Sequence, residues 1–137
     1  VVFCNKQNNL LFSGDTLFRF GCGRIFEGTY DEMQKSLNKI EKLDDSINVY
    51  CGHEYTIHNL KFLKEIFHND KTLDKVEQDI LKQIKQTKSS MPFNLGNEKR
   101  LNPFLSLHSP TYRNFMEKKG FDDVEMFKYL RDLRNNY

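Results

Sequence analysis

The sequence has 137 residues, and its 21 Lys and Arg residues nearly balance its 19 Asp and Glu residues. That length suits one domain, and so small a net charge gives no indication of a nucleic-acid partner. No apolar stretch approaches the roughly 20 residues that a membrane-spanning helix needs, and the three cysteines form no C-x-x-C pair, which favours free thiols over a disulfide framework.

The first half of the chain is predicted to be rich in strands. Apolar runs at residues 1–4 and 10–12 flank a polar turn and predict a hairpin. A glycine-rich loop follows, and Thr29 with Glu32 three residues later forms a capping box that marks the start of a helix. Residues 47–51 alternate in polarity and predict a further strand that ends at a Gly-His pair.

The second half is predicted to be helical. Apolar residues recur at helical spacing in four segments, at about residues 56–67, 73–85, 110–118 and 124–135. Residues 89–103 contain two prolines and one glycine and predict a long ordered connection. This change in character divides the chain into a β-rich portion, residues 1–58, and a helical portion, residues 59–137.

Two polar side chains follow predicted strands at the points where the strands end. Asp15 comes after an apolar strand and a glycine, and His53 closes the third strand. Strand ends in layered α/β folds deliver polar groups to a shared cleft, so both are candidate metal ligands. Taken alone, each residue is more typical of a structural role: Gly-Asp-Thr is ordinary turn chemistry, and a lone His after a strand is more often a hydrogen-bonded structural residue. Two donors are also fewer than the three protein ligands that a metal site needs.

Arg131 and Arg134 lie one turn apart on the last predicted helix and therefore share a face. Two planar guanidinium groups suit the binding of a carboxylate. The alternative interpretation is a solvated basic face.

Three motifs stand in the first half of the chain: FSGDTLF at residues 12–18, GCGRIFEGT at 21–29 and YCGHEYT at 50–56. Together and in this order they resemble glyoxalase II, the hydroxyacylglutathione hydrolases of the metallo-β-lactamase superfamily. NLKF at 59–62, NPF at 102–104 and LRDLR at 130–134 resemble its helical domain. The resemblance covers essentially the whole chain and implies an α+β, αββα-type fold. Residues 1–58 would be the second half of a metallo-β-lactamase fold, and 59–137 a helical domain that binds the substrate.

The resemblance also implies roles for individual residues at a metal site. Asp15 would bridge two divalent metal ions, because one carboxylate can offer an oxygen to each, and His53 would be a terminal ligand of the second ion. Zinc, iron and manganese all suit such oxygen and imidazole ligands. The family's Thr-His-x-His-x-Asp-His motif and its later Gly-His-Thr segment do not occur in this sequence. The metal site of this chain by itself is therefore expected to be incomplete, and the chain inactive.

Four residues match family positions that bind the glutathione part of the substrate: Arg24, Tyr55, Arg131 and Arg134. The family often has Lys where this chain has Arg24, which keeps the positive charge. The implied activity is a hydrolase of the glyoxalase pathway, which detoxifies methylglyoxal. It would convert S-D-lactoylglutathione to D-lactate and glutathione, without a nucleic-acid or membrane partner.

The sequence opens on Val1 without an initiator Met, which favours a fragment of a longer protein. A half-sheet with an exposed apolar surface would favour a dimer. The expected location is cytoplasmic, with a mitochondrial or plastid location as the alternative. Two other functions stay open: a persulfide dioxygenase with one iron, which the EYT segment and the basic helical tail argue against, and a non-catalytic paralogue that binds glutathione.

Overall fold

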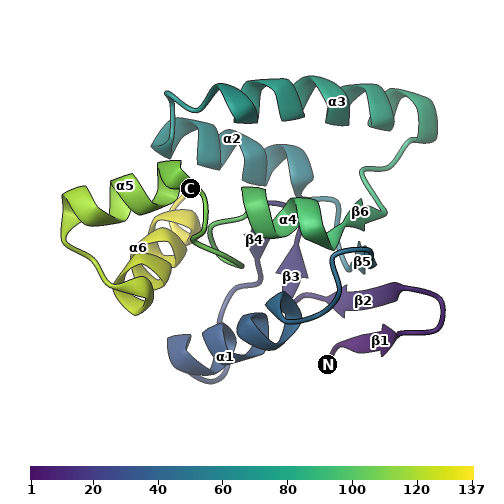
Figure 1. The fold of residues 1–137 in the computed structure, drawn as a ribbon, viewed down its shortest axis with the longest axis horizontal. Coiled ribbons are helices and arrows are strands. Elements are labelled where there is room, and N and C mark those ends of the chain that lie inside the picture. The colour runs from purple at the N-terminus through teal and green to yellow at the C-terminus, as the bar shows by residue number, and fades with distance from the viewer.

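The computed structural model describes residues 1–137 and combines six helices with short strands. The strands are β1 (Phe3–Asn5), β2 (Leu10–Gly14), β3 (Leu17–Phe18), β4 (Gly21–Cys22), β5 (Asn48–Cys51) and β6 (Phe93–Asn94). The helices are α1 (Tyr30–Glu41), α2 (Thr56–Ile66), α3 (Lys71–Thr87), α4 (Leu95–Leu101), α5 (Pro110–Lys119) and α6 (Asp123–Asn135). Figure 1 shows the hairpin β1–β2 at one end of the molecule and the pair α5 and α6 at the other. The expected mixture of strands and helices is confirmed.

Four strands form one sheet in the order β1-β2-β5-β6. β1 pairs antiparallel with β2, β2 pairs parallel with β5, and β5 pairs antiparallel with β6. Because side chains alternate between the faces of a strand, Leu11 and Val49 point to one face, where they are fully buried. Phe12 and Tyr50 point to the other face and are exposed. The sheet therefore packs on the core with one side only.

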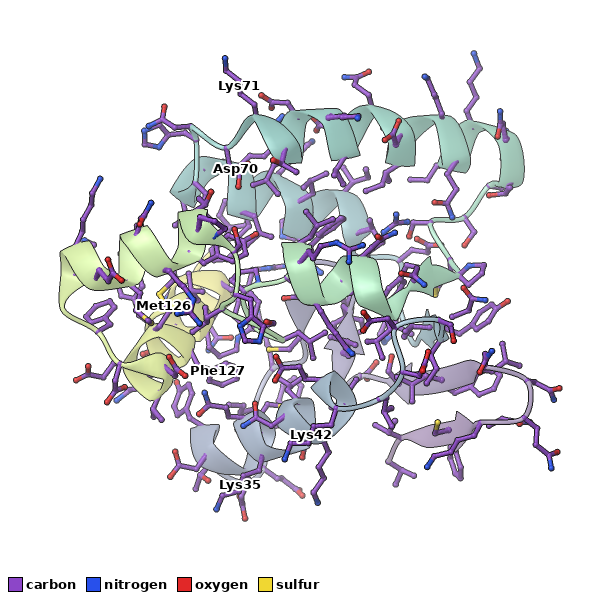
Figure 2. The ribbon with its side chains drawn as sticks, viewed as in Figure 1. Lys35, Lys42, Asp70, Lys71, Met126 and Phe127 are labelled. Atoms are coloured by element: carbon purple, nitrogen blue, oxygen red, sulfur yellow. The ribbon has the colours of Figure 1, made fainter.

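The core lies between the buried face of the sheet and the helices, and it joins both halves of the chain. It contains 22 buried residues, from Leu11 in β2 to Leu130 in α6. Helix α1 packs against α6, and α2 packs against α3. Figure 2 shows Met126 and Phe127 of α6 inside the molecule, whereas Lys35 and Lys71 extend into solvent.

The predicted hairpin, the helix that begins after Thr29 and the four predicted helices of the second half are confirmed. In α1, the Thr29 hydroxyl accepts from the backbone of Glu32, and the Glu32 side chain accepts from the backbone of Thr29. This reciprocal pair satisfies two donors at the helix start, which is why the motif predicts the boundary so well. None of the helices has the length and apolar character needed to cross a membrane.

The expectation of a long connection at residues 89–103 was wrong. The segment contains β6, which pairs with β5, and the seven-residue helix α4. Asn94 begins that helix, because its side chain accepts a hydrogen bond from the backbone N–H of Asn97 at 2.9 Å. An element this short has too few turns for an apolar periodicity to appear in the sequence.

Candidate functional site

A cavity of about 510 Å³ lies where β2, the β3–β4 hairpin, the start of α2 and the end of α6 meet. It is lined by Asp15, Phe18, Cys22, Gly23, Arg24, Phe26, His53, Tyr55, His58, Asn59, Arg131 and Arg134. All six residues that the sequence singled out are in this set. They come from segments far apart in the chain, so the fold itself brings them together.

Asp15 and His53 face each other at one end of the cavity. The Nε2 atom of His53 lies 3.5 Å from Oδ1 of Asp15, and both side chains are exposed. They meet because β2 and β5 are parallel neighbours, so both strands end at the same edge of the sheet. The backbone N–H of Gly52 donates to the carbonyl of Gly14 at 2.8 Å and closes that edge.

Gly52 is required for this approach. A Cβ atom at that position would lie 2.5 Å from Oδ1 of Asp15, which is too close for any side chain. Gly23 is constrained in the same way, because its Cβ would lie 1.9 Å from the carbonyl oxygen of Asp15. Two glycines thus allow the backbone to close around Asp15 and hold its carboxylate towards His53.

The pair Asp15 and His53 fits a corner of a metal site. Two ligands at about 2.1 Å from one tetrahedral ion are about 3.4 Å apart, close to the observed separation of the imidazole nitrogen and the carboxylate oxygen. The chain contains no group of three or more His, Cys, Asp and Glu side chains that could hold an ion. These residues can supply two ligands, and a catalytic ion needs at least one more.

Aromatic rings pack around His53 and fix its orientation. The His53 ring stacks on the Tyr55 ring with centroids 5.0 Å apart and planes inclined by 16°. The Phe18 ring meets the edge of Tyr55 at 5.1 Å. Tyr55 is exposed, so its hydroxyl is available to a molecule in the cavity.

Arg131 lies beneath the floor of the cavity and supports the glycine loop. Its side chain is only 2% exposed, and its Nη1 donates to the carbonyls of Cys22 at 2.7 Å and Gly23 at 3.3 Å. Its guanidinium also lies over the ring of Phe104 at 5.5 Å. Arg131 therefore joins α6 to the loop in addition to any contact with a bound molecule.

Cys22 is not suited to act as a nucleophile. It is buried, and burial raises the pKa of its thiol to about 11 despite the nearby Arg131. The thiol is therefore neutral at physiological pH, and only the thiolate is strongly nucleophilic.

Arg134 is held in place by Asn59, a residue to which the sequence reasoning gave no role. Oδ1 of Asn59 accepts from Nε and Nη2 of Arg134, while its Nδ2 donates to the carbonyl of Arg19 at 3.1 Å. Burial lowers the pKa of Arg134, and the nearby charges of Arg131 and Arg24 lower it further. Three guanidinium groups so close together, without a carboxylate among the cavity residues near them other than Asp15, favour an anionic ligand.

The β3–β4 hairpin is held from behind by α4. Phe20 has φ +61°, an unfavourable left-handed conformation for a bulky residue, and its backbone N–H donates to the carboxylate of Glu98. Nδ2 of Asn102 donates to the carbonyls of Phe18 at 3.3 Å and Gly21 at 3.1 Å. Asn102 of the NPF segment thus holds the β3–β4 hairpin in place. In this way it sets the position of Phe18 and Cys22 in the cavity.

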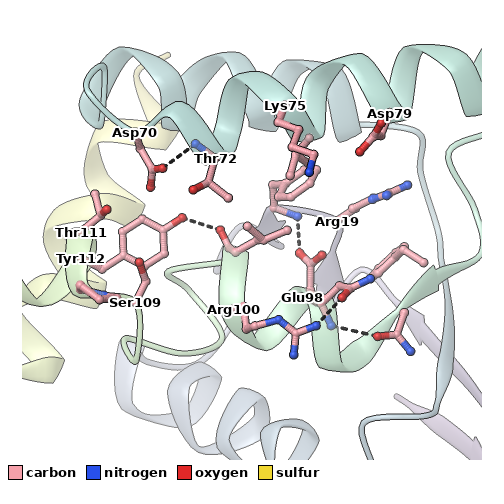
Figure 3. Close-up of a pocket in the computed structure, with 17 residues that line it drawn as sticks. Arg19, Asp70, Thr72, Lys75, Asp79, Glu98, Arg100, Ser109, Thr111 and Tyr112 are labelled. Atoms are coloured by element: carbon pink, nitrogen blue, oxygen red, sulfur yellow. Dashed lines mark hydrogen bonds between the residues drawn. The ribbon is translucent and has the colours of Figure 1, made fainter.

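A larger cavity of about 650 Å³ lies between α3, α4 and the start of α5. Figure 3 shows its lining, with Lys75 and Asp79 from α3 and Glu98 and Arg100 from α4. Its lining contains both cations and carboxylates, and neither Asp15 nor His53 belongs to it. The smaller cavity is therefore the candidate site, because there the paired metal donors and the basic wall adjoin.

The fold and the site define a mixed α/β protein with a basic pocket beside the Asp15 and His53 side chains. A family model, the hydroxyacylglutathione hydrolase C-terminus, matches residues 54–137. That range is more than half of the chain, and the chain belongs to this family.

Curated relatives extend the similarity beyond the matched domain. The chain is similar to the hydroxyacylglutathione hydrolases of Bartonella tribocorum (39% identity over 131 residues) and Bartonella quintana (42% over 132 residues), each match covering 96% of the chain and 52% of the relative. It is also similar to that of Nitrosomonas europaea, with 38% identity over 140 residues, 99% of the chain and 53% of the relative. The chain thus spans about half the length of the curated relatives it matches.

Proposed function

We propose that this chain provides the C-terminal half of a hydroxyacylglutathione hydrolase, which hydrolyses S-D-lactoylglutathione to D-lactate and glutathione. The observation that carries the proposal is the meeting of Asp15 and His53 with Arg24, Arg131 and Arg134 around one cavity. The curated relatives, of which the chain spans about half, are named for this activity. In the proposed enzyme, residues 1–58 complete a metallo-β-lactamase fold and residues 59–137 form the domain that binds glutathione.

The basic wall supports the binding part of the proposal. Glutathione carries two carboxylates, and the guanidinium groups of Arg24 and Arg134 can donate to them in pairs. Tyr55 offers a hydroxyl on the side of the cavity nearest His53, where the thioester would lie. Arg131 acts mainly from below, because its Nη1 is engaged by backbone carbonyls.

Asp15 and His53 support the chemical part. In the proposed enzyme, Asp15 and His53 would be two of the side chains that hold the divalent ions. Bound there, such ions lower the pKa of water and polarise a carbonyl, which is the chemistry that thioester hydrolysis needs. The further ligands come from a preceding segment, as the family's motifs imply. Zinc is the proposed metal, with iron and manganese as alternatives.

The proposal is tested on two proteins: the 137-residue chain and the extended protein, which is this chain together with the preceding residues that bring it to the length of its relatives. We expect S-D-lactoylglutathione turnover and metal binding in the extended protein and neither in the shorter chain. Loss of turnover and of bound metal is expected in the Asp15→Asn and His53→Gln variants of the extended protein, with circular dichroism showing that the fold is retained. An inactive, metal-loaded extended protein that still binds glutathione would point to the non-catalytic paralogue instead.

We also propose that the 137-residue chain forms a dimer through its open sheet face. Phe3, Phe12 and Tyr50 lie next to one another across β1, β2 and β5, and Phe12 stacks on Tyr50 with ring centroids 5.6 Å apart. These rings are exposed, and a contiguous aromatic surface on a sheet favours association.

A further inference from the structure

Glu54, which directly follows His53, is bound to a segment that takes no part in the cavity. Its carboxylate accepts hydrogen bonds from the hydroxyls of Ser89 and Ser90 and from the backbone N–H of Ser90, the last at 3.0 Å. Ser89 and Ser90 lie between α3 and β6, more than thirty residues along the chain. A surface carboxylate is thus attached at three points to a distant part of the fold.

Ser89 and Ser90, the partners of Glu54, belong to a segment that is hydrogen-bonded to other parts of the fold. Ser90 is fully buried, and its hydroxyl lies 2.6 Å from that of Thr56, the first residue of α2. Its carbonyl accepts from Nη1 of Arg19 at 2.7 Å. Arg19 belongs to the turn of the β3–β4 hairpin, which carries Phe18 and Cys22 into the cavity. The two serines therefore join the turn at residues 52–55 to the hairpin opposite it.

We propose that Glu54 is a positioning residue: by holding residues 52–55 against Ser89 and Ser90, it sets the orientation in which His53 and Tyr55 face the cavity. Glu54 lies between His53 and Tyr55 in the sequence, and the two rings stack on each other with centroids 5.0 Å apart. The other contacts of the imidazole are the rings of Tyr55 and Phe18, since its side chain is half exposed and its Nε2 lies 3.5 Å from Oδ1 of Asp15. The role in substrate turnover rests on the proposed function, whereas the role in ring orientation does not.

The carboxylate acts through its hydrogen bonds. Both of its oxygens accept, one from Ser89 and the backbone N–H of Ser90 and the other from the Ser90 hydroxyl. A glutamine can reproduce the same contacts, because its carbonyl oxygen can accept from Ser89 and from the Ser90 N–H while its amide donates to the Ser90 hydroxyl. Glu54→Gln therefore keeps the hydrogen bonds and removes the negative charge, whereas Glu54→Ala removes both.

The first test measures ring orientation in the 137-residue chain, without any requirement for activity. Nuclear Overhauser effects between the His53 and Tyr55 rings are recorded for the unmodified chain, Glu54→Gln, Glu54→Ala and the control Glu117→Ala. Glu117 is an exposed residue of α5 without a side-chain hydrogen bond or ion pair. We expect the ring contacts in all proteins except Glu54→Ala. Should that variant unfold, Ser89→Ala, which removes one of the three bonds, is expected to weaken the same signals. Full ring contacts in Glu54→Ala would overturn the proposal. If Glu54→Ala is unfolded, full ring contacts in Ser89→Ala would overturn it instead.

The second test measures kcat and KM in the extended protein. Removal of a group that orients a metal-ligating histidine lowers activity by about 10–100-fold, so Glu54→Ala should lose at least about tenfold in kcat/KM. Glu54→Gln should recover most of that loss. A glutamine variant as poor as the alanine variant would show that charge is what matters and would overturn the positioning role. Inactivity of the unmodified extended protein would instead reject the proposed function, and the ring-contact test would then decide the role of Glu54 alone.

Discussion

Asn59 and Arg134 are 75 positions apart in the sequence and are joined by two hydrogen bonds, from Nε at 3.2 Å and from Nη2 at 3.1 Å to the same amide oxygen. The pair links α2 to α6 across the cavity. Asn59 is almost fully buried, and Gly21 leaves room for it, since a Cβ there would lie 2.7 Å from its Nδ2. The Arg134 guanidinium is thereby held with its remaining N–H groups free for a carboxylate.

Replacement of Asn59 should therefore weaken substrate binding. A hydrogen bond to a charged group is worth about 1.5–3 kcal/mol, so Asn59→Ala in the extended protein should raise KM about tenfold or more, with a smaller change in kcat. Asn59→Asp keeps an acceptor but neutralises Arg134, and it should raise KM as well. Steady-state kinetics with S-D-lactoylglutathione measure both, with Asn69→Ala in the exposed α2–α3 connection as the control. An unchanged KM in both Asn59 variants would remove Arg134 from the binding site.

Replacement of Arg131 should lower folding stability more than replacement of Arg134 does. Arg131→Ala leaves the carbonyls of Cys22 and Gly23 without their buried donor, and each such group costs about 1–3 kcal/mol. We expect a loss of folding stability of about 3 kcal/mol, together with weaker binding. Arg134 is less buried than Arg131, so water can replace it at Oδ1 of Asn59, and Arg134→Ala should raise KM with a smaller loss of stability than Arg131→Ala. Urea unfolding of the 137-residue chain separates the two, and equal stability of both variants would contradict the supporting role of Arg131.

Glu98 should make stability depend on pH. Burial raises the pKa of this carboxyl to about 7 from an ordinary value of 4.5, although the Phe20 N–H and Arg19 act against the shift. A raised folded-state pKa means that the native protein holds the proton more tightly than the unfolded chain does. The stability that Glu98 contributes is therefore complete below about pH 4.5 and is lost as the pH rises through about 7.

The comparison with Glu98→Gln tests this dependence. Relative to the glutamine variant, the unmodified chain should lose on the order of 3 kcal/mol between pH 4.5 and pH 8, from the shift between the two pKa values. Urea unfolding at both pH values measures the difference, and Glu117→Gln on the exposed face of α5 serves as the control. A difference between the unmodified chain and Glu98→Gln that stays constant with pH would show that the fold does not raise the pKa of Glu98.

The long elements could be predicted from sequence because their signals are local. The capping box at Thr29 and the apolar spacing of α3 and α6 depend only on residues within the same helix. β3, β4 and β6 have two residues each, too few for a pattern, and they form because Glu98, Asn102 and β5 provide partners from elsewhere in the chain. Their existence is a tertiary effect that no local window contains.

Six of the residues that line the cavity were named from the sequence, but their contacts could not be predicted. Asp15 and His53 gave ambiguous local signals, and their flanking motifs singled them out through a family resemblance. The burial of Arg131 was not predictable from the sequence. Its spacing from Arg134 shows only that the two residues share a helix face, and such a face can be buried or solvated. The roles of Asn59 and Glu54 depend on partners more than thirty residues away and become visible only in three dimensions.

The open sheet face leads to a prediction about association. Phe12 is 46% exposed between Phe3 and Tyr50, so Phe12→Thr should disrupt the aromatic surface while keeping a residue that favours strands. Sedimentation velocity of the 137-residue chain should show a concentration-dependent dimer that Phe12→Thr abolishes. Leu81→Gln, at an equally exposed position on α3, should leave the dimer intact. A chain that is monomeric at every concentration would contradict this use of the face.

The most direct measurement of the central claim is S-D-lactoylglutathione hydrolysis by the extended protein, with bound metal determined on the same sample. The account predicts turnover and two metal ions per chain in the extended protein, both lost in Asp15→Asn, and no turnover by the 137-residue chain. Hydrolysis that survives Asp15→Asn with its metal content unchanged, or an extended protein that is folded and metal-loaded but does not hydrolyse the thioester, would contradict it.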